Sequence, residues 1–304
     1  MPVVNEDWRD PAGWAKARVC WGLVRDGDAV RLSRCAGRSA EAEAVLPVAA
    51  FAAGEGAAGR LRAEVRRGAR LVAGLDPSRV VLRDLRSPLR DAAKAEEVWP
   101  ALLDAALPYP LEGCVVAFAG SRPAEGSGLR CAAYAAREED VRAEVAAWEA
   151  LGVSPDLLVP EAAVLLAAGG AGLKIWRGTS RMVFVWGGGT EGGSGLQCGG
   201  AKADVPVPPG LKRFCLALGV EADAAEAVTG LSGRLAELGL QGGAGLVNLR
   251  GGELASAGLR GRHARAGRAA AVAGVALVLA GVTLPWGLAG RLTAEQGALR
   301  REMA

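Results

Sequence analysis

The stretch from Trp186 to Thr190 holds the residue types in this sequence best suited to bind a phosphate. It reads Trp186-Gly187-Gly188-Gly189-Thr190 and follows an apolar run. Glycines let backbone amides come close to an anion, and the threonine hydroxyl adds a further donor. A flexible loop is the alternative, because the 304 residues include 44 glycines. These three glycines and Thr190 are our candidate cofactor-binding residues.

Few other residues in the chain are of the types that carry out catalysis. The single histidine, His263, lies in a basic stretch, so a serine nucleophile would lack a histidine partner and a metal would lack imidazole ligands. No GxxxxGK[ST] loop is present, and no GxGxxG opens a helix. The acidic run Glu138–Asp140 is typical of a solvated helix start. We therefore predict no catalytic residue, no bound metal and no conventional enzyme.

The cysteine pattern favours a reduced protein. None of the six cysteines belongs to a CxxC pair, and most lie in apolar runs, which is typical of buried free thiols in a reducing compartment. The cysteines are Cys20, Cys35, Cys114, Cys131, Cys198 and Cys215.

Charge and aromatic content argue against nucleic acid as a partner. Lysine and arginine number 36 against 33 aspartates and glutamates, and there are only two tyrosines and four phenylalanines. Nucleic-acid binding usually needs a strongly basic face with stacking aromatics.

A hydrophobic segment, Ala269–Gly290, carries no charged residue. As a helix it would span about 33 Å, enough to cross a bilayer core; the alternative is a buried core helix. More arginines precede it than follow it, where only Arg291 lies close, so the positive-inside rule places the N-terminal body in the cytoplasm. The preceding arginines are Arg260, Arg262, Arg265 and Arg268.

The domain organisation follows from this segment. We predict a cytoplasmic body over residues 1–258, a basic juxtamembrane linker over 259–268, a transmembrane helix over 269–290 and a truncated periplasmic coiled coil over 291–304. Leu292, Gln296, Leu299 and Met303 supply the 4-3-4 spacing of a coiled-coil seam.

The first half of the body is predicted to alternate short strands with helices. Its helix over Ala92–Ala106 is expected to bury Val98, Leu102 and Ala105. A hairpin is predicted around Asp26-Gly27-Asp28. The predicted strands are Ala17–Arg25, Ala29–Cys35, Arg70–Gly74, Arg79–Leu85, Cys114–Ala119 and Leu129–Ala135, and the other helix is Ala57–Arg67.

The second half repeats this pattern. A helix over Glu138–Leu151 is expected to bury Val141, Val145 and Trp148. The other predicted helices are Pro160–Ala168, Pro209–Leu218 and Glu221–Leu238, and the strands are Leu157–Val159, Leu173–Trp176, Met182–Trp186 and Leu246–Leu249. The strands Leu173–Trp176 and Met182–Trp186 are predicted to form a hairpin around Arg177-Gly178-Thr179. The pattern predicts an α/β or α+β body of two related lobes with a boundary near residues 136–140.

Three segments carry a resemblance to a known family. They are Trp99–Val116 (WPALLDAALPYPLEGCVV), Trp148–Ala163 (WEALGVSPDLLVPEAA) and Leu246–Ala255 (LVNLRGGELA). In this order they resemble the inner-membrane platform protein L of type II secretion systems and its relative, platform protein M of type IV pili. The resemblance covers roughly Arg79 to Arg301.

The resemblance implies a fold and a role. The fold is an actin-like (ribonuclease H-like), two-lobed α/β body followed by one membrane helix. The role is a scaffold in the bacterial inner membrane that recruits the secretion ATPase and binds other platform proteins. A homodimer is compatible with this role. The family also carries a periplasmic ferredoxin-like domain after the span.

An actin-like ATPase would carry acidic residues in its two phosphate loops. At the second loop this sequence has Trp186 in place of the acidic residue. The segment most similar to the Asp-x-Gly pattern of the first loop is Cys20-Trp21-Gly22, which has no carboxylate. We therefore predict a non-hydrolysing protein without a cofactor. One alternative is an active actin-like ATP-binding protein or ATPase. A second is a single-pass membrane regulator such as an anti-sigma factor, although those have small helical domains with a zinc motif.

Overall fold

The computed structural model describes residues 3–4, 17–124, 127–168, 171–187, 196–241, 247–251 and 254. These residues belong to one compact unit, Met1–Ser256. The predicted linker (259–268), membrane helix (269–290) and coiled coil (291–304) lie outside them. Within the described ranges, no helix is both long and apolar enough to cross a membrane.

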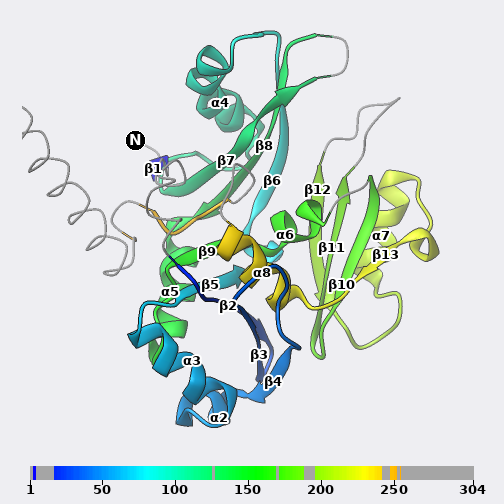
Figure 1. Ribbon diagram of the computed structural model, residues 1–304. Coiled ribbons are helices and arrows are strands. Elements are labelled where there is room, and N and C mark those ends of the chain that lie inside the picture. The colour runs from blue at the N-terminus through cyan, green and yellow to red at the C-terminus, as the bar shows by residue number, and fades with distance from the viewer. Residues whose placement is uncertain are drawn as a thin grey trace, which may run out of the picture. The chain divides into compact units, whose positions relative to one another are not determined.

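Strands and helices alternate along the chain (Figure 1). The strands are β1 (Val3–Val4), β2 (Cys20–Asp26), β3 (Ala29–Cys35), β4 (Ala44–Pro47), β5 (Arg70–Leu75), β6 (Val81–Ser87), β7 (Cys114–Pro123), β8 (Leu129–Arg137), β9 (Leu157–Pro160), β10 (Gly172–Arg177), β11 (Arg181–Gly187), β12 (Gln197–Lys202) and β13 (Glu226–Val228). The helices are α2 (Val48–Ala53), α3 (Ala57–Arg66), α4 (Ala92–Ala106), α5 (Glu138–Ala150), α6 (Glu161–Ala167), α7 (Pro209–Leu218) and α8 (Leu231–Gln241), with 3-10 turns η2 (Pro77–Arg79) and η3 (Ala222–Ala224).

The strands form three sheets, with orders β4-β3-β2-β5-β9, β1-β7-β8-β6 and β12-β11-β10-β13. In the first, β2 and β3 make the predicted antiparallel hairpin, and β5 and β9 add in parallel. Strand β9 lies after the predicted lobe boundary, yet it pairs with a strand of the first half. The domain limits themselves stay predictions.

Helix α8 packs directly on β2, and two glycines allow this close approach. A Cβ on Gly22 would lie 1.9 Å from the carbonyl oxygen of Ser232 in α8. A Cβ on Gly239 would lie 2.4 Å from the side chain of Val72 on β5. Both glycines are therefore required for the contact between helix and sheet.

Helix α4 covers the sheet β1-β7-β8-β6, but its buried face differs from our prediction. The helix buries Ala95, Trp99 and Leu103, whereas the predicted Leu102 is 37% exposed. Trp99 is the largest side chain on the helix, and its indole N–H donates to Ser121 Oγ at 3.1 Å. Burying this ring turns the helix by about one residue, because burial favours the largest apolar group.

Helix α5 agrees with the prediction only in part. Val141 and Trp148 are buried, but Val145 is half-buried and Glu144 is buried instead. Glu144 tolerates burial because Arg25 and Arg79 pair with its carboxylate at 3.4 and 3.2 Å.

Two further differences from the prediction lie in and beside the third sheet. Residues 221–238 do not form one helix: they form η3, the strand β13 and the start of α8. Gly230 stands between strand and helix with φ of 62°, which breaks the helix. Strand β12 was not predicted, because its centre is Gly199-Gly200, which has little strand propensity.

The predicted strand Leu246–Leu249 is wrong where the structure describes it, since residues 247–251 form no strand. The segment instead lies along β9 through one side-chain bond and one backbone bond. Asn248 Oδ1 accepts from the backbone of Leu158 at 3.0 Å, and the Leu249 amide donates to the Leu158 carbonyl at 2.8 Å. The buried Arg250 donates to Ser154 Oγ at 3.2 Å.

The prediction of buried free thiols is confirmed: all six thiols are free, and all except the half-buried Cys198 are buried. Burial raises the pKa of Cys131 to about 12, so this thiol stays protonated and unreactive near neutral pH.

Candidate functional site

Two hairpin turns, one from each half of the body, meet in the structure. The turn between β2 and β3 brings Asp26 against the turn between β10 and β11. Asp26 accepts from the backbone amides of Thr179 at 2.5 Å and Ser180 at 2.9 Å, and from the Ser180 hydroxyl at 2.7 Å. Its carboxylate is therefore the main polar link between the two hairpins.

Arg31 completes this junction from the neighbouring strand β3. Its Nε donates to Asp26 Oδ2 at 2.8 Å, and one Nη donates to Thr179 Oγ1 at 2.6 Å. The other Nη pairs with Glu43 at 2.9 Å. Burial opposes the charge of Arg31, but the bonds to Asp26 and Glu43 outweigh it and raise the pKa of its guanidinium.

Glycines make this contact sterically possible. A Cβ on Gly178 would lie 2.5 Å from the Asp26 carboxylate, and one on Gly27 would lie 2.7 Å from Ser180 Oγ. Gly27 also has φ of 62°, the left-handed conformation that a tight hairpin turn needs.

The Asp26 carboxylate is ionised throughout the ordinary pH range. Asp26 is 1% exposed, and this burial alone would raise its pKa. The hydrogen bonds from Thr179, Ser180 and Arg31 outweigh burial and hold the pKa of Asp26 well below its usual range.

A second buried ion pair lies close by. Arg181, the first residue of β11, donates to both carboxylate oxygens of Glu161 in α6 at 2.6 Å each, and to the Arg25 carbonyl at 2.8 Å. Burial is the largest cause of the raised pKa of Glu161, and Arg181 opposes that rise without cancelling it. The guanidinium also lies 5.3 Å from the ring centre of Trp176. This pair links β2, α6 and β11.

Chemically, the second turn is an anion-binding cradle. Successive backbone amides, a hydroxyl and a guanidinium converge on one point, as they do where proteins hold phosphate. Here the chain's own Asp26 fills that point, so any free anion would have to displace a buried, ionised carboxylate. Over the described parts of the chain, no group of three or more Cys, His, Asp or Glu side chains is arranged to hold a metal ion.

The residues predicted from sequence lie elsewhere. Gly187 ends β11, about 20 Å along the strand from the Gly178–Ser180 turn, and pairs with Gly172. Gly188, Gly189 and Thr190 lie outside the described residues. Trp21 and Gly22 lie inside β2, as the predicted strand Ala17–Arg25 implies, and Trp21 is buried and donates to Glu64 at 2.9 Å.

Sequence reasoning missed Asp26, Arg31 and Ser180 as site residues. The available signal was the parallel between two hairpins, since Asp26-Gly27-Asp28 and Gly178-Thr179-Ser180 each join two apolar strands. Both hairpins were predicted, but nothing local showed that their turns touch.

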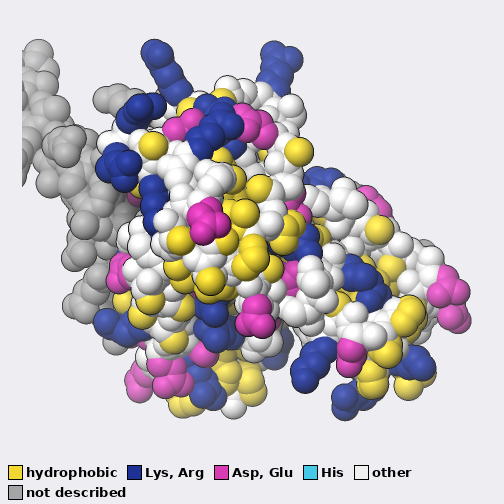
Figure 2. Space-filling model, turned by 90° about the horizontal axis from the view of Figure 1, so that it is seen from below, with side chains coloured by type: hydrophobic (Ala, Val, Ile, Leu, Met, Phe, Trp, Pro, Cys, Tyr) yellow, Lys and Arg dark blue, Asp and Glu magenta, His cyan; other side chains and the backbone are white. Residues whose placement is uncertain are grey.

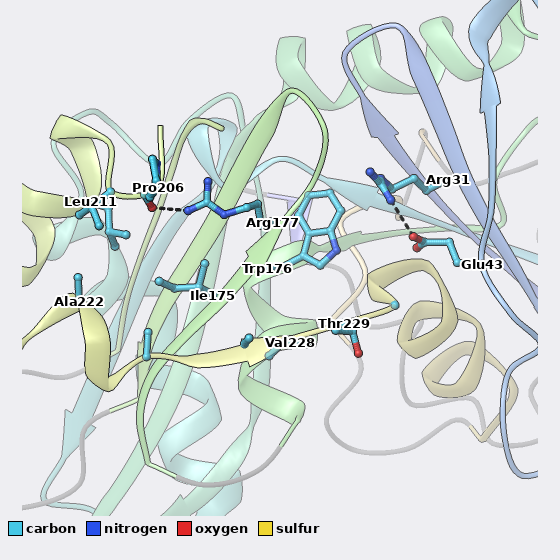
Figure 3. A pocket seen from close by; sticks show the side chains of 14 residues that line it. Arg31, Glu43, Ile175, Trp176, Arg177, Pro206, Leu211, Ala222, Val228 and Thr229 are labelled. Atoms are coloured by element: carbon cyan, nitrogen blue, oxygen red, sulfur yellow. Dashed lines mark hydrogen bonds and ion pairs between the residues drawn. The ribbon is translucent and has the colours of Figure 1, made fainter. Parts of the chain in front are cut away.

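A groove lies beside the junction, with a volume of about 520 Å³. Arg31 and Glu43 line one end, the buried Trp176 lies between, and Ile175 and Leu211 line the other end (Figure 3). Its lining is mostly apolar, so the groove suits an apolar side chain better than a polyphosphate.

The face shown in Figure 2 carries no charge field of one sign. On the face shown in Figure 2, Lys and Arg side chains alternate with Asp and Glu among apolar ones. That face therefore does not show the basic footprint that nucleic-acid binding needs.

No protein-family profile and no curated protein sequence matches the chain. Solved structures do. The cytoplasmic domain of EpsL, an inner-membrane component of the type II secretion system of Vibrio cholerae, superposes with a TM-score of 0.50 at 12% identity, over 78% of this chain and 99% of that one.

Two further structures are less similar. A chain of the PilM–PilN type IV pilus biogenesis complex gives a TM-score of 0.43 at 20% identity, over 66% of each chain. A Bacteroides thetaiotaomicron protein with an actin-like ATPase fold and unknown function gives 0.33 at 9% identity, over 69% of this chain and 80% of that one.

The likeness to EpsL confirms the predicted resemblance at the level of the fold. The predicted α/β body is confirmed, and its fold is that of a secretion-system protein's cytoplasmic domain.

Proposed function

We propose that this chain is a non-catalytic platform component of a type II secretion or type IV pilus-like machine. Its body would lie in the cytoplasm, residues 269–290 would cross the bacterial inner membrane once, and the C-terminus would be periplasmic. The body would bind the secretion ATPase and other platform proteins, which raises their local concentration at the membrane.

The observation that carries this proposal is the coverage of the EpsL domain. Almost the whole of that domain, 99%, has a counterpart in this chain at a TM-score of 0.50. Three sequence segments that resemble the platform protein, and the apolar run that follows them, support the same role. A common fold alone would not be enough, because one fold hosts many functions.

The non-catalytic part of the proposal rests on the hairpin junction. Asp26 satisfies both turn amides and Arg31, so the point where a phosphate would be held is already filled by the chain. Displacing it would expose a buried carboxylate and leave Arg31 without one of its two carboxylate partners. Active ATP binding is the competing function.

Membrane attachment and ATPase binding can be tested separately. We would express the full chain with a tag beside the secretion ATPase of the same genome, separate membranes from cytosol, and purify the tagged chain. The ATPase should co-purify with it from the membrane fraction. A variant lacking residues 269–290 should move to the cytosol and still bind the ATPase. If the intact chain retains no ATPase here or in a two-hybrid assay, the recruitment role is wrong.

A further inference from the structure

Strand β13 leaves one edge of its sheet open. It pairs in parallel with β10, and it is the last strand in the order β12-β11-β10-β13, with no further partner strand among the described residues. Glu226 and Ala227 of β13 are exposed. The backbone N–H and C=O groups on this edge are therefore a template for an added strand.

The groove runs along this same strand. Ala225, just before β13, and Ala227 on β13 form one wall of the groove, and their small side chains leave space in front of Ile175 and Leu211. A strand added to β13 would place alternate side chains on one face. One of them would then enter the groove, which is large enough for a branched apolar side chain.

A fixed cation lies at the rim. Arg177 donates to the carbonyl of Val205 at 3.1 Å and to that of Pro206, so its guanidinium is held beside the groove (Figure 3). Within the described ranges it makes no ion pair with a carboxylate. Lys212 on α7 is also exposed, but it does not line the groove. A carboxylate is the complementary group, because the planar guanidinium binds it with two parallel bonds.

We propose that β13 and its groove bind an extended segment of a partner protein. The segment adds as a strand to β13, buries one apolar side chain against Ile175 and Leu211, and sets an Asp or Glu on Arg177. This docking site goes beyond the proposed function and does not depend on which machine the chain serves.

The test selects ligands without assuming a partner. A phage library of random dodecapeptides is panned against the full-length chain in nanodiscs, and the enriched peptides are resynthesised with a fluorophore. We expect peptides that combine an apolar residue with Asp or Glu. Backbone N-methylation should abolish their binding, because a strand bound at an edge needs its amides.

Three variants locate the site. Arg177→Glu reverses the charge at the rim, and Ala227→Trp fills the groove from an exposed position. Each should weaken binding at least about tenfold. Lys212→Glu makes the same charge change on α7 outside the groove lining and should change affinity less than about threefold. Unchanged thermal melting of the variants shows that they are folded.

Two results would overturn the proposal. One is that no enriched peptide loses affinity in both Arg177→Glu and Ala227→Trp. The other is that sedimentation shows the chain pairing with itself through β13, since the occupant would then be a second copy. ATPase co-purification is a separate measurement, so a failure of this site leaves the proposed function standing.

Discussion

The two sheets that meet at the hairpin junction are built alike but packed differently. In the sheet β4-β3-β2-β5-β9, every residue of β5 is buried, and α8 approaches β2 so closely that Gly22 has no room for a Cβ. In the sheet β12-β11-β10-β13, no residue of β12 is fully buried, and two of the three β13 residues are exposed. The first sheet is tightly packed at its centre, whereas the edge strand β13 of the second keeps backbone and apolar surface available for a partner.

Their turns differ in the same way. The first turn holds its acid, Asp26, fully buried, whereas the strand before the second turn ends in an exposed base, Arg177. A nucleotide site would need both turns free to hold phosphate and metal. In this chain one turn holds the other, an arrangement that we call a structural lock and that supports the proposal that the junction binds no nucleotide.

The largest expected effect compares one glycine from each sheet. Gly22→Ala puts a methyl group 1.9 Å from the Ser232 carbonyl and 2.7 Å from the Ala236 amide nitrogen, so α8 must shift. We expect a loss of about 3 kcal/mol or more in the free energy of unfolding, measured with urea. The matched control is Gly200→Ala on β12, whose nearest neighbours lie at 3.5 Å or more. It should change stability by less than about 0.5 kcal/mol, and equal losses would refute the contrast between the sheets.

The second-largest effect is expected at Asp26, the residue that forms the structural lock. Asp26→Ala leaves two turn amides and one bond of Arg31 unsatisfied, which should cost about 2–4 kcal/mol in urea unfolding. Asp28→Ala changes an exposed acid in the same turn and should cost less than about 0.5 kcal/mol. A small effect of Asp26→Ala would mean that the two sheets are held together by other contacts.

A pH dependence should identify the charge on Asp26 as the cause. Its folded pKa lies below the unfolded value of about 3.9, so its contribution is complete above about pH 5 and is lost as the pH falls toward the folded pKa. The stability difference between wild type and Asp26→Asn should be constant from pH 7 to 5 and shrink below about pH 4. A difference that persists undiminished at pH 3 would contradict the ionised state.

The smallest expected effect is that of nucleotide on the melting temperature. With the turn amides already satisfied by Asp26, MgATP should shift the melting temperature of the full chain by less than about 1 °C relative to Mg²⁺ alone. A rise of several degrees would favour the active ATP-binding alternative over the structural lock.

The sequence by itself determined most elements of the body. Alternating apolar residues and the Asp-Gly and Gly-Thr turns predicted both hairpins, and α7 and α4 occur where helical periodicity placed them. These features depend on neighbours within a few residues, so local propensity and patterning carry them. The resemblance of three segments to the platform protein also pointed to the fold.

Features that depend on residues far apart in the sequence were decided only by the tertiary structure. Glu221–Leu238 is rich in helix-forming residues, yet part of it became β13 because β10 offered a parallel partner. The buried face of α4 followed the fit of Trp99. Asp26 and Ser180 are 154 positions apart in the sequence, and no local pattern shows that they touch. A buried carboxylate needs donors from wherever the fold brings them, so its partners are fixed by packing and not by sequence spacing.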